Sequence, residues 1–180
     1  MFIYNTNNFG EITIGKNTEI IELDYKNQPI LVRLIGFNDD FDRSGWTVLP
    51  PPPYKIINGK DDGCIHWCAS TLDQYPHADE IARQFFIDDF SRDKFLRQCF
   101  EDYFKNFTVE QVFKIFGDRF SIEDIVGRLD YPDLFFEQEG DYVYTNLEYK
   151  VSDLSPEIVI GVTMELGLGI ISYGKGHKEQ

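Results

Sequence analysis

Hydrophobic and polar positions alternate along the first 36 residues, which predicts β-strands. In residues 18–25, three apolar side chains alternate with two acids, as in a strand with one face in water. Residues 30–36 are apolar except for Arg33, which favours a central strand. A polar loop at 38–45 and then Pro50 to Pro53 interrupt this pattern. Consecutive prolines require an extended segment and cannot lie within a sheet.

From residue 77 onward the apolar positions recur at helical spacing. The segments 77–90 and 91–107 each carry an apolar stripe rich in Phe, with charged residues on the opposite side. Residues 108–117 begin with the capping-box pair Thr108 and Gln111 and close on a glycine. Residues 121–129 begin at a serine, which is a favoured N-cap. We therefore expect a block of helices in the middle of the chain.

Strand patterns return after residue 134. The segments 134–138, 141–151, 157–166 and 169–174 are separated by residues that favour turns. Strands thus precede and follow the helices without the alternation that marks a parallel doubly wound sheet. We predict an α+β fold in one domain, residues 1–180. Its antiparallel sheet takes strands from both the N- and C-terminal regions, and the Phe-rich helices pack on one face.

The charge balance changes the picture of possible partners. The chain has 31 acids against 17 Lys and Arg, a net charge of −14. Such a surface repels phosphate backbones, so we expect no nucleic-acid ligand. It attracts a basic protein, although an acidic exterior also serves solubility alone. No stretch approaches the roughly 20 apolar residues that cross a bilayer, and the N-terminus lacks the features of a secretory signal. We expect a cytoplasmic protein with reduced thiols and no membrane contact.

The stretch CIHWC at residues 64–68 is the first candidate for chemistry. In an extended chain Cys64, His66 and Cys68 share one side, but the two cysteines lie about 13 Å apart, too far for one zinc ion. In a helix the cysteines meet and His66 points away. We therefore interpret these residues as structural and expect no metal and no cofactor. The alternative is a hydrolase or transferase with a Cys/His site that includes His77.

A calcium-loop motif fails on inspection, and several catalytic motifs are absent. Asp40, Asp42, Ser44 and Gly45 match the start of a calcium loop, but Pro51 stands where the bidentate Glu is required. A polar turn is the better interpretation of that loop. The sequence has no phosphate-binding glycine motif, no zinc-protease motif and no nucleophile elbow.

Both ends of the chain resemble a known group of proteins. The segments FGEITI (9–14), IIELDYKNQPILVRLIG (20–36) and LEYKVSDLSPEIVIGVTMELGLGIISYG (147–174) are similar to small bacterial domains of unknown function. Relatives of these domains lie near toxin genes and are suspected immunity proteins. The resemblance implies a small inhibitor of a basic toxin, and it supplies no functional residues to carry over.

These observations favour a non-enzymatic, acidic protein-binding domain, in the specific form of an immunity-type inhibitor of a basic toxin. The middle helices carry the densest acidic charge. We name four carboxylates on these helices as candidate contacts: Asp88, Asp89, Glu101 and Asp102.

Overall fold

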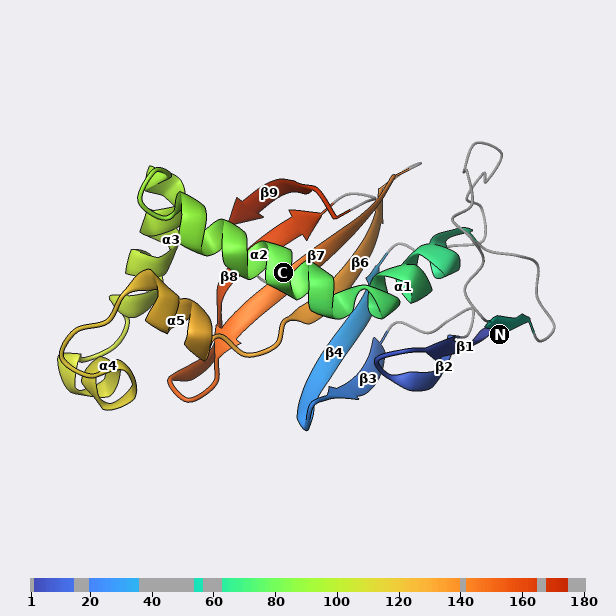
Figure 1. The fold of residues 1–180 in the computed structure, drawn as a ribbon, viewed down its shortest axis with the longest axis horizontal. Helices are drawn as coiled ribbons and strands as arrows, with labels where there is room; N and C mark the ends of the chain where they lie inside the picture. The colour runs from blue at the N-terminus through green and yellow to red at the C-terminus, as the bar shows by residue number, and fades with distance from the viewer. Residues whose placement is uncertain are drawn as a thin grey trace. The chain divides into compact units, whose positions relative to one another are not determined.

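A computed structural model describes residues 2–14, 20–35, 54–56, 63–139, 142–164 and 168–174 (Figure 1). The predicted polyproline segment and the loop with Asp40 and Asp42 lie outside these residues. The elements in chain order are β1 (Phe2–Thr6), β2 (Gly10–Ile14), β3 (Ile20–Tyr25), β4 (Gln28–Ile35), β5 (Tyr54–Ile56), α1 (Gly63–Asp73), α2 (Tyr75–Asp89), α3 (Lys94–Phe104), α4 (Val109–Phe116), α5 (Ile122–Arg128), β6 (Asp133–Glu139), β7 (Tyr142–Val151), β8 (Ser155–Met164) and β9 (Ile170–Gly174).

The strands form two sheets. The smaller sheet has the order β2-β1-β5, and both of its pairings are antiparallel. The larger sheet has the order β3-β4-β6-β7-β8-β9 and so takes strands from both ends of the chain. Its end pairs β3–β4 and β8–β9 are antiparallel, whereas β4 and β6 are parallel, with Val32 opposite Leu134. The predicted α+β class, with a central helical block, is confirmed.

The chain divides into two compact units. The first unit contains Met1–Ala78 and Leu134–Thr145, and the second contains Asp79–Asp133 and Asn146–Gln180. Our expectation of one domain over the whole chain stays a prediction.

In the first unit an aromatic cluster joins the end of β3 and the start of α2 to the turn between β1 and β2. The ring centroids of Phe9, Tyr25 and Tyr75 lie 5.0–5.7 Å from one another. The amide of Asn8 donates hydrogen bonds to the carbonyls of Leu72 (3.0 Å) and Asp73 (2.9 Å). These are carbonyls at the end of α1, which have no partner within their own helix. The turn therefore caps α1 as well as packing beside it.

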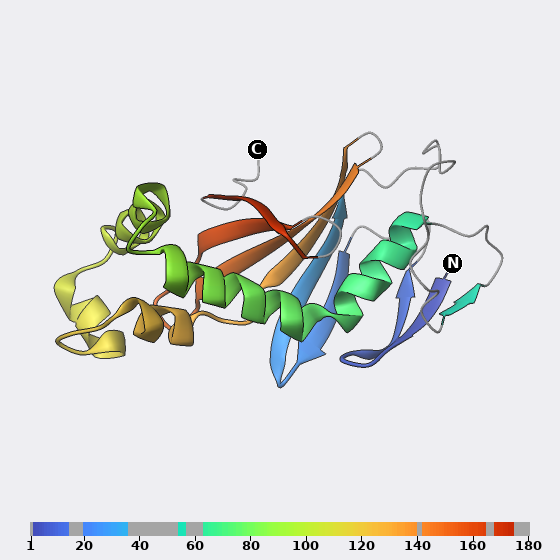
Figure 2. The ribbon, with the colours of Figure 1, turned by 45° about the horizontal axis from the view of Figure 1, so that its top comes forward.

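The second unit has the Phe-rich core that the sequence predicted. Phe86 of α2 lies fully buried between Phe100 of α3 and Tyr149 of β7, at ring-centroid distances of 5.8 and 5.3 Å. Figure 2 shows α2 lying over β7 in this unit. Both ring pairs are edge-to-face, the arrangement that aromatic quadrupoles favour. Burial of these rings is a hydrophobic contribution that joins α2 and α3 to the sheet.

Candidate binding surface on the second unit

The CIHWC stretch lies on a helix. Helix α1 begins at Gly63, so Cys64, His66 and Cys68 occupy its first two turns and not a strand. The helix forms because Cys68, Ala69 and Leu72 recur at helical spacing, and all three are fully buried. This helical periodicity is visible only when residues 64–68 are considered together with residues 69–73.

Of the predicted Cys/His residues, the structure describes the side chains of Cys68 and His77, and these two differ in exposure. The thiol of Cys68 has no exposed area, so a substrate could not reach it in the folded protein. His77 is exposed in the first turn of α2. The side chains of Cys64 and His66 fall outside the described part of the chain. Within that part, no group of three His, Cys, Asp or Glu side chains could hold a metal ion.

The four predicted carboxylates lie on α2 and α3 of the second unit, and they differ in their surroundings. Asp88 is exposed and accepts a hydrogen bond from the amide of Gln84 (2.8 Å). Glu101 is also exposed, and Asp89 is half-buried at the end of α2. Exposed carboxylates of this kind are available to a basic partner.

Asp102 differs because it already has a cation. Its carboxylate lies 2.9 Å from the ammonium of Lys105 and accepts a hydrogen bond from Gln98 (2.6 Å). The hydrogen bond and charge of Asp102 raise the pKa of Lys105, so Lys105 keeps its positive charge to higher pH. Of the four carboxylates, Asp102 is thus the least able to attract a second cation.

Helix α4 presents an exposed apolar surface of the second unit. Its apolar residues recur at positions i, i+3, i+4 and i+7, and none of its eight residues, all of them described, is buried. Val109 is 82% exposed and Phe113 is 52% exposed, and Phe120 beyond the helix is 39% exposed. We call this surface the α4 face and define it as Val109, Val112, Phe113, Phe116 and Phe120.

Local interactions explain why α4 is a helix without a buried side. The Thr108 hydroxyl accepts a hydrogen bond from the Gln111 N–H (3.3 Å), and the Gln111 side chain accepts one from the Thr108 N–H (2.8 Å). This capping box satisfies two backbone donors at the start of the helix. Gly117 ends the helix with a φ of 80°, which a residue with a Cβ rarely adopts. Most protein helices depend on tertiary burial instead.

A small aromatic cluster attaches the α4 face to α3. Phe116 and Phe120 lie 5.6 and 6.0 Å from the ring of Phe104, and 5.1 Å from each other. Phe116 is half-buried in this contact, while Val109 and Phe113 project from the other turns of the same helix. The cluster therefore fixes the position of α4 on α3 and leaves most of the face uncovered.

Acidic residues outnumber basic ones in the segment of the sequence that contains the α4 face. Residues 101–124 contain six acids and three bases, which gives this segment a net charge of −3. A hydrogen bond from its own backbone N–H and one from Thr108 lower the pKa of Glu110, and the backbone N–H of Ser121 lowers the pKa of Asp124. Free N–H groups at helix starts favour the ionised carboxylate in this way. These acids are consequently charged well below neutral pH.

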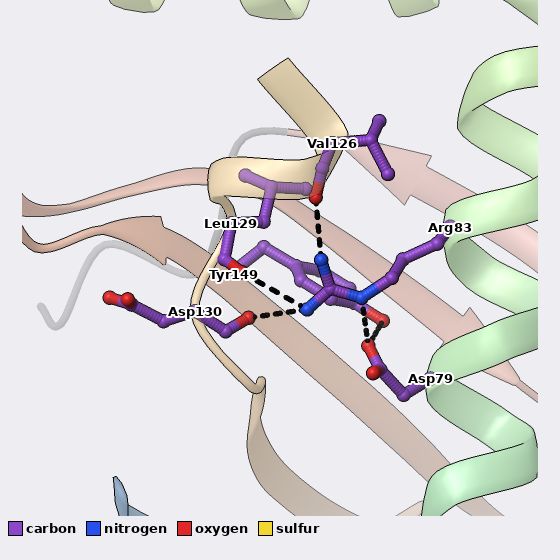
Figure 3. A network of polar contacts seen from close by, with 6 residues as sticks. All are labelled: Asp79, Arg83, Val126, Leu129, Asp130 and Tyr149. Atoms are coloured by element: carbon purple, nitrogen blue, oxygen red, sulfur yellow. Dashed lines mark hydrogen bonds and ion pairs between the residues drawn. The ribbon is translucent and has the colours of Figure 1, made fainter. Parts of the chain in front are cut away.

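The second unit also contains a buried charged network, which Figure 3 shows. Arg83 of α2 donates from Nε to a carboxylate oxygen of Asp79 (2.8 Å), and the Tyr149 hydroxyl donates to the same oxygen (3.1 Å). Asp79 is only 6% exposed. A buried charge pair of this kind can mark an active site. The remaining contacts of Arg83 therefore decide whether this pair is catalytic or structural.

The other contacts of Arg83 are structural. Its Nη1 donates to the carbonyl of Val126 (2.6 Å), and its Nη2 donates to those of Leu129 (3.1 Å) and Asp130 (2.8 Å) (Figure 3). These carbonyls lie at the end of α5, where a cation is favoured, and that of Val126 also accepts from the Leu129 N–H (3.3 Å). Arg83 thus caps α5 and ties it to α2, and its fork of donors is directed at protein atoms.

Sequence reasoning identified α4 and its cap but missed the α4 face as a candidate site. The apolar spacing of α4 resembles that of α3, and spacing alone does not show which face is covered. One signal was present: five Phe occur between residues 104 and 120, in a segment that also carries Val109, Val112 and Ile115. Such a density of large apolar side chains in a short, capped helix and its flanking loops is a reason to look for an exposed patch.

No protein family, no curated protein and no solved structure matches this chain. The resemblance to immunity-type domains therefore depends on the quoted terminal segments alone. None of the described helices is long and apolar enough to cross a membrane.

Proposed function

We propose that this chain is a non-enzymatic protein-binding domain that docks a basic partner on the α4 face. The observation that carries this proposal is the exposure of a complete amphipathic helix, with Val109 at 82% and Phe113 at 52%. Contiguous exposed apolar surface rimmed by polar residues is typical of interaction sites. Phenylalanine rings fixed by a supporting cluster, as here, are suited to fill pockets of a partner.

The electrostatics favour a basic partner over a neutral one. The chain carries a net charge of −14, and the segment around the α4 face carries −3. A charge of this sign accelerates the encounter with a cationic protein and disfavours acidic competitors. In this proposal Asp88, Asp89, Glu101 and Asp102 act as outer contacts, which affect the association rate more than the lifetime of the complex.

An immunity-type inhibitor of a basic toxin is the specific form that we propose. Such an inhibitor needs only to cover a functional surface of the toxin, so it requires no catalytic group. A hydrophobic docking helix with acidic surroundings supplies the two properties that this task needs, which are buried apolar contact and charge complementarity. The terminal segments quoted above resemble suspected immunity proteins, which agrees with this form.

The proposal is tested with basic proteins encoded beside this chain's gene. Each is co-expressed with the chain to measure rescue of growth, and binding is measured by calorimetry. We expect one of them to bind, and we expect the double substitution Val109→Asp, Phe113→Asp to weaken that binding at least about 100-fold. The matched control is Ile20→Asp, because Ile20 of the first unit is 57% exposed and lies outside the α4 face.

Salt provides the second readout. Affinity should fall at least about tenfold between roughly 50 and 500 mM salt, because screening shortens the range of surface charges. Unchanged affinity over this range would contradict the electrostatic part of the proposal. Full binding by the Val109/Phe113 double variant would show that the α4 face is not the docking site.

A further inference from the structure

A second exposed apolar patch lies on α3 and β9, separate from the α4 face. Phe95 is 57% exposed and Ile171 is 47% exposed. The ring of Tyr173 lies 5.8 Å from that of Phe95 and 5.1 Å from that of Phe85, centroid to centroid. We call these four residues the Phe95 patch. All of them belong to the second unit.

One carboxylate holds the two halves of the Phe95 patch together. Asp93 accepts hydrogen bonds from the N–H groups of Phe95 (2.8 Å) and Leu96 (3.0 Å), so it caps the start of α3. The Tyr173 hydroxyl of β9 donates to the same carboxylate. The helix start and the strand are therefore linked through Asp93, and the patch is ordered before any partner arrives. Preorganisation of this kind lowers the entropic cost of association.

The patch adjoins an end strand of the larger sheet. Among the residues that the structure describes, β9 pairs only with β8. Ser172 lies opposite Thr163 and Ile170 opposite Met164, so Ile171 is an extra residue in a β-bulge. A bulge disrupts the hydrogen-bond ladder and prevents continuous strand addition. Association at this edge should therefore occur through side chains and should stop at two chains.

The opposite end strand shows how a sheet edge is protected against association. β3 has Ile20 exposed, but it also presents the exposed acids Glu22 and Asp24. Charged residues on an edge strand are a common protection against pairing with another chain. β9 has the sequence IISYG and no charged residue. Of the two end strands, β9 is the one that permits apolar contact.

The charges beside the Phe95 patch indicate what covers it. Residues 88–97 contain three acids and three bases, a net charge of zero in a chain of −14. The acids Asp88 and Asp89 close α2, and Arg92 and Lys94 follow them toward α3. A two-fold arrangement can place the acidic end of one copy opposite the basic end of the other, because isologous contacts pair each patch with itself. A neutral patch gives no special attraction to a basic partner.

We propose that a second copy of this chain covers the Phe95 patch and forms a two-fold symmetric dimer. This inference goes beyond the proposed function, because the Phe95 patch and its partner are different, and the two surfaces share only the outer carboxylates Asp88 and Asp89. Phe95 and Ile171 of each copy supply the apolar contact, and the balanced charges of residues 88–97 supply its orientation. The α4 face remains free in the dimer for the heterologous partner.

The test is the molar mass of the full chain in solution, measured by sedimentation equilibrium from about 10 μM to about 1 mM. We expect the mass to rise from one chain toward two over this range. Phe95→Glu and Ile171→Glu should each raise the dissociation constant at least about tenfold, because each buries an unpaired charge in the contact. Ile20→Glu and Phe113→Glu are matched controls at similarly exposed positions and should leave it unchanged. Circular dichroism verifies that each variant is folded.

Salt separates this inference from the proposed function. Two chains of −14 repel each other outside the patch, so raising salt from about 50 to about 500 mM should strengthen the dimer. The same change should weaken binding of a basic partner. A chain that stays monomeric at about 1 mM in high salt overturns the dimer. A dimer abolished by Phe113→Glu and not by Phe95→Glu also overturns it, because the second copy would then occupy the α4 face.

Discussion

Helices α3 and α4 follow each other in the chain, and each has an apolar stripe, yet only α3 has its stripe buried. α3 buries Leu96, Cys99, Phe100 and Tyr103 against the second unit. α4 has apolar residues at the same kind of spacing and buries none of them. The comparison shows that periodicity predicts the existence of an apolar face but not what covers it.

The two helices also differ in what stabilises them. α3 is held by tertiary burial, with Phe100 in contact with the rings of Phe86 and Phe90. α4 is held by its capping box, by Gly117 and by the contact of Phe116 with Phe104. Substitutions in α3 should therefore affect the stability of the whole unit, whereas substitutions in α4 should affect binding or local opening.

The largest difference should come from truncating one phenylalanine in each helix. Phe100→Ala removes a ring that is 1% exposed and should lower the free energy of unfolding by about 3–5 kcal/mol. Phe113→Ala removes a ring that is 52% exposed and should change it by less than about 0.5 kcal/mol. Urea unfolding of both variants measures the difference. Equal losses would mean that the α4 face is covered in the folded chain.

A somewhat smaller loss should follow removal of the clamp that holds α5, the helix after α4. Arg83→Ala removes one donor from each of the carbonyls of Val126, Leu129 and Asp130 and removes the Arg83 cation beside Asp79. We therefore expect a loss of about 2–4 kcal/mol in urea unfolding. Arg83→Lys should lose most of this, because an ammonium cannot reproduce the guanidinium fork. Arg128→Ala, at an exposed position of α5, is the control. A wild-type stability for Arg83→Ala would refute the clamp.

The cap of α4 should contribute less and only locally. Thr108→Ala removes the hydroxyl that accepts from Gln111 and should weaken α4 by about 1 kcal/mol. Because α4 buries no residue, amide hydrogen exchange should accelerate in α4 while global urea unfolding stays the same. Ser121→Ala is the matched variant at the cap of α5, whose Ile125 and Val126 are buried. Its effect should extend to the global transition, and the opposite pattern would contradict the comparison.

The smallest expected effect is a pH dependence that belongs to α3. Burial, followed by the charges of Glu157 and Asp130, raises the pKa of Tyr103 from 10.0 to about 12. The folded state thus holds the proton more tightly than the unfolded state. This contribution to stability is complete below pH 10 and is lost as the pH rises through about 12. The melting temperature, measured between pH 9 and 12, should therefore fall less steeply with pH for Tyr103→Phe than for the wild type.

Tyr173→Phe provides a second measurement on the same scale. The hydrogen bond to Asp93 raises the pKa of Tyr173 to about 12 as well. Tyr173→Phe should therefore also make the melting temperature fall less steeply between pH 9 and 12. Wild-type slopes in both variants would show that neither tyrosine carries the alkaline dependence. No tyrosine lies in α4, so substitutions there should leave the slope unaltered.

Local signals predicted most of the helices correctly. The capping residues Thr108 and Ser121 mark the starts of α4 and α5, because a cap is formed by neighbours in sequence. The alternation in residues 18–25 likewise predicted β3 and its exposed acids. α1 was not predicted, because residues 64–68 suit either a strand or a helix when they are considered without the residues that follow.

Contacts between distant residues were beyond the reach of the sequence. The parallel pairing of β4 with β6 joins segments about a hundred residues apart, and no local pattern specifies it. The same holds for Arg83, which reads as an ordinary helix-surface charge and in fact contacts carbonyls 43–47 residues away. The α4 face was missed for a related reason, since exposure is a property of the whole fold.

The clamp between Arg83 and the end of α5 has a consequence for sequence variation in α4. It closes the chain from α2 to α5 into a loop, with the Arg83 side chain at one end and backbone carbonyls at the other. Helix α4 lies within this loop and contributes little to the core. Residues of α4 that neither cap the helix nor contact Phe104 can therefore be substituted with little effect on the rest of the second unit.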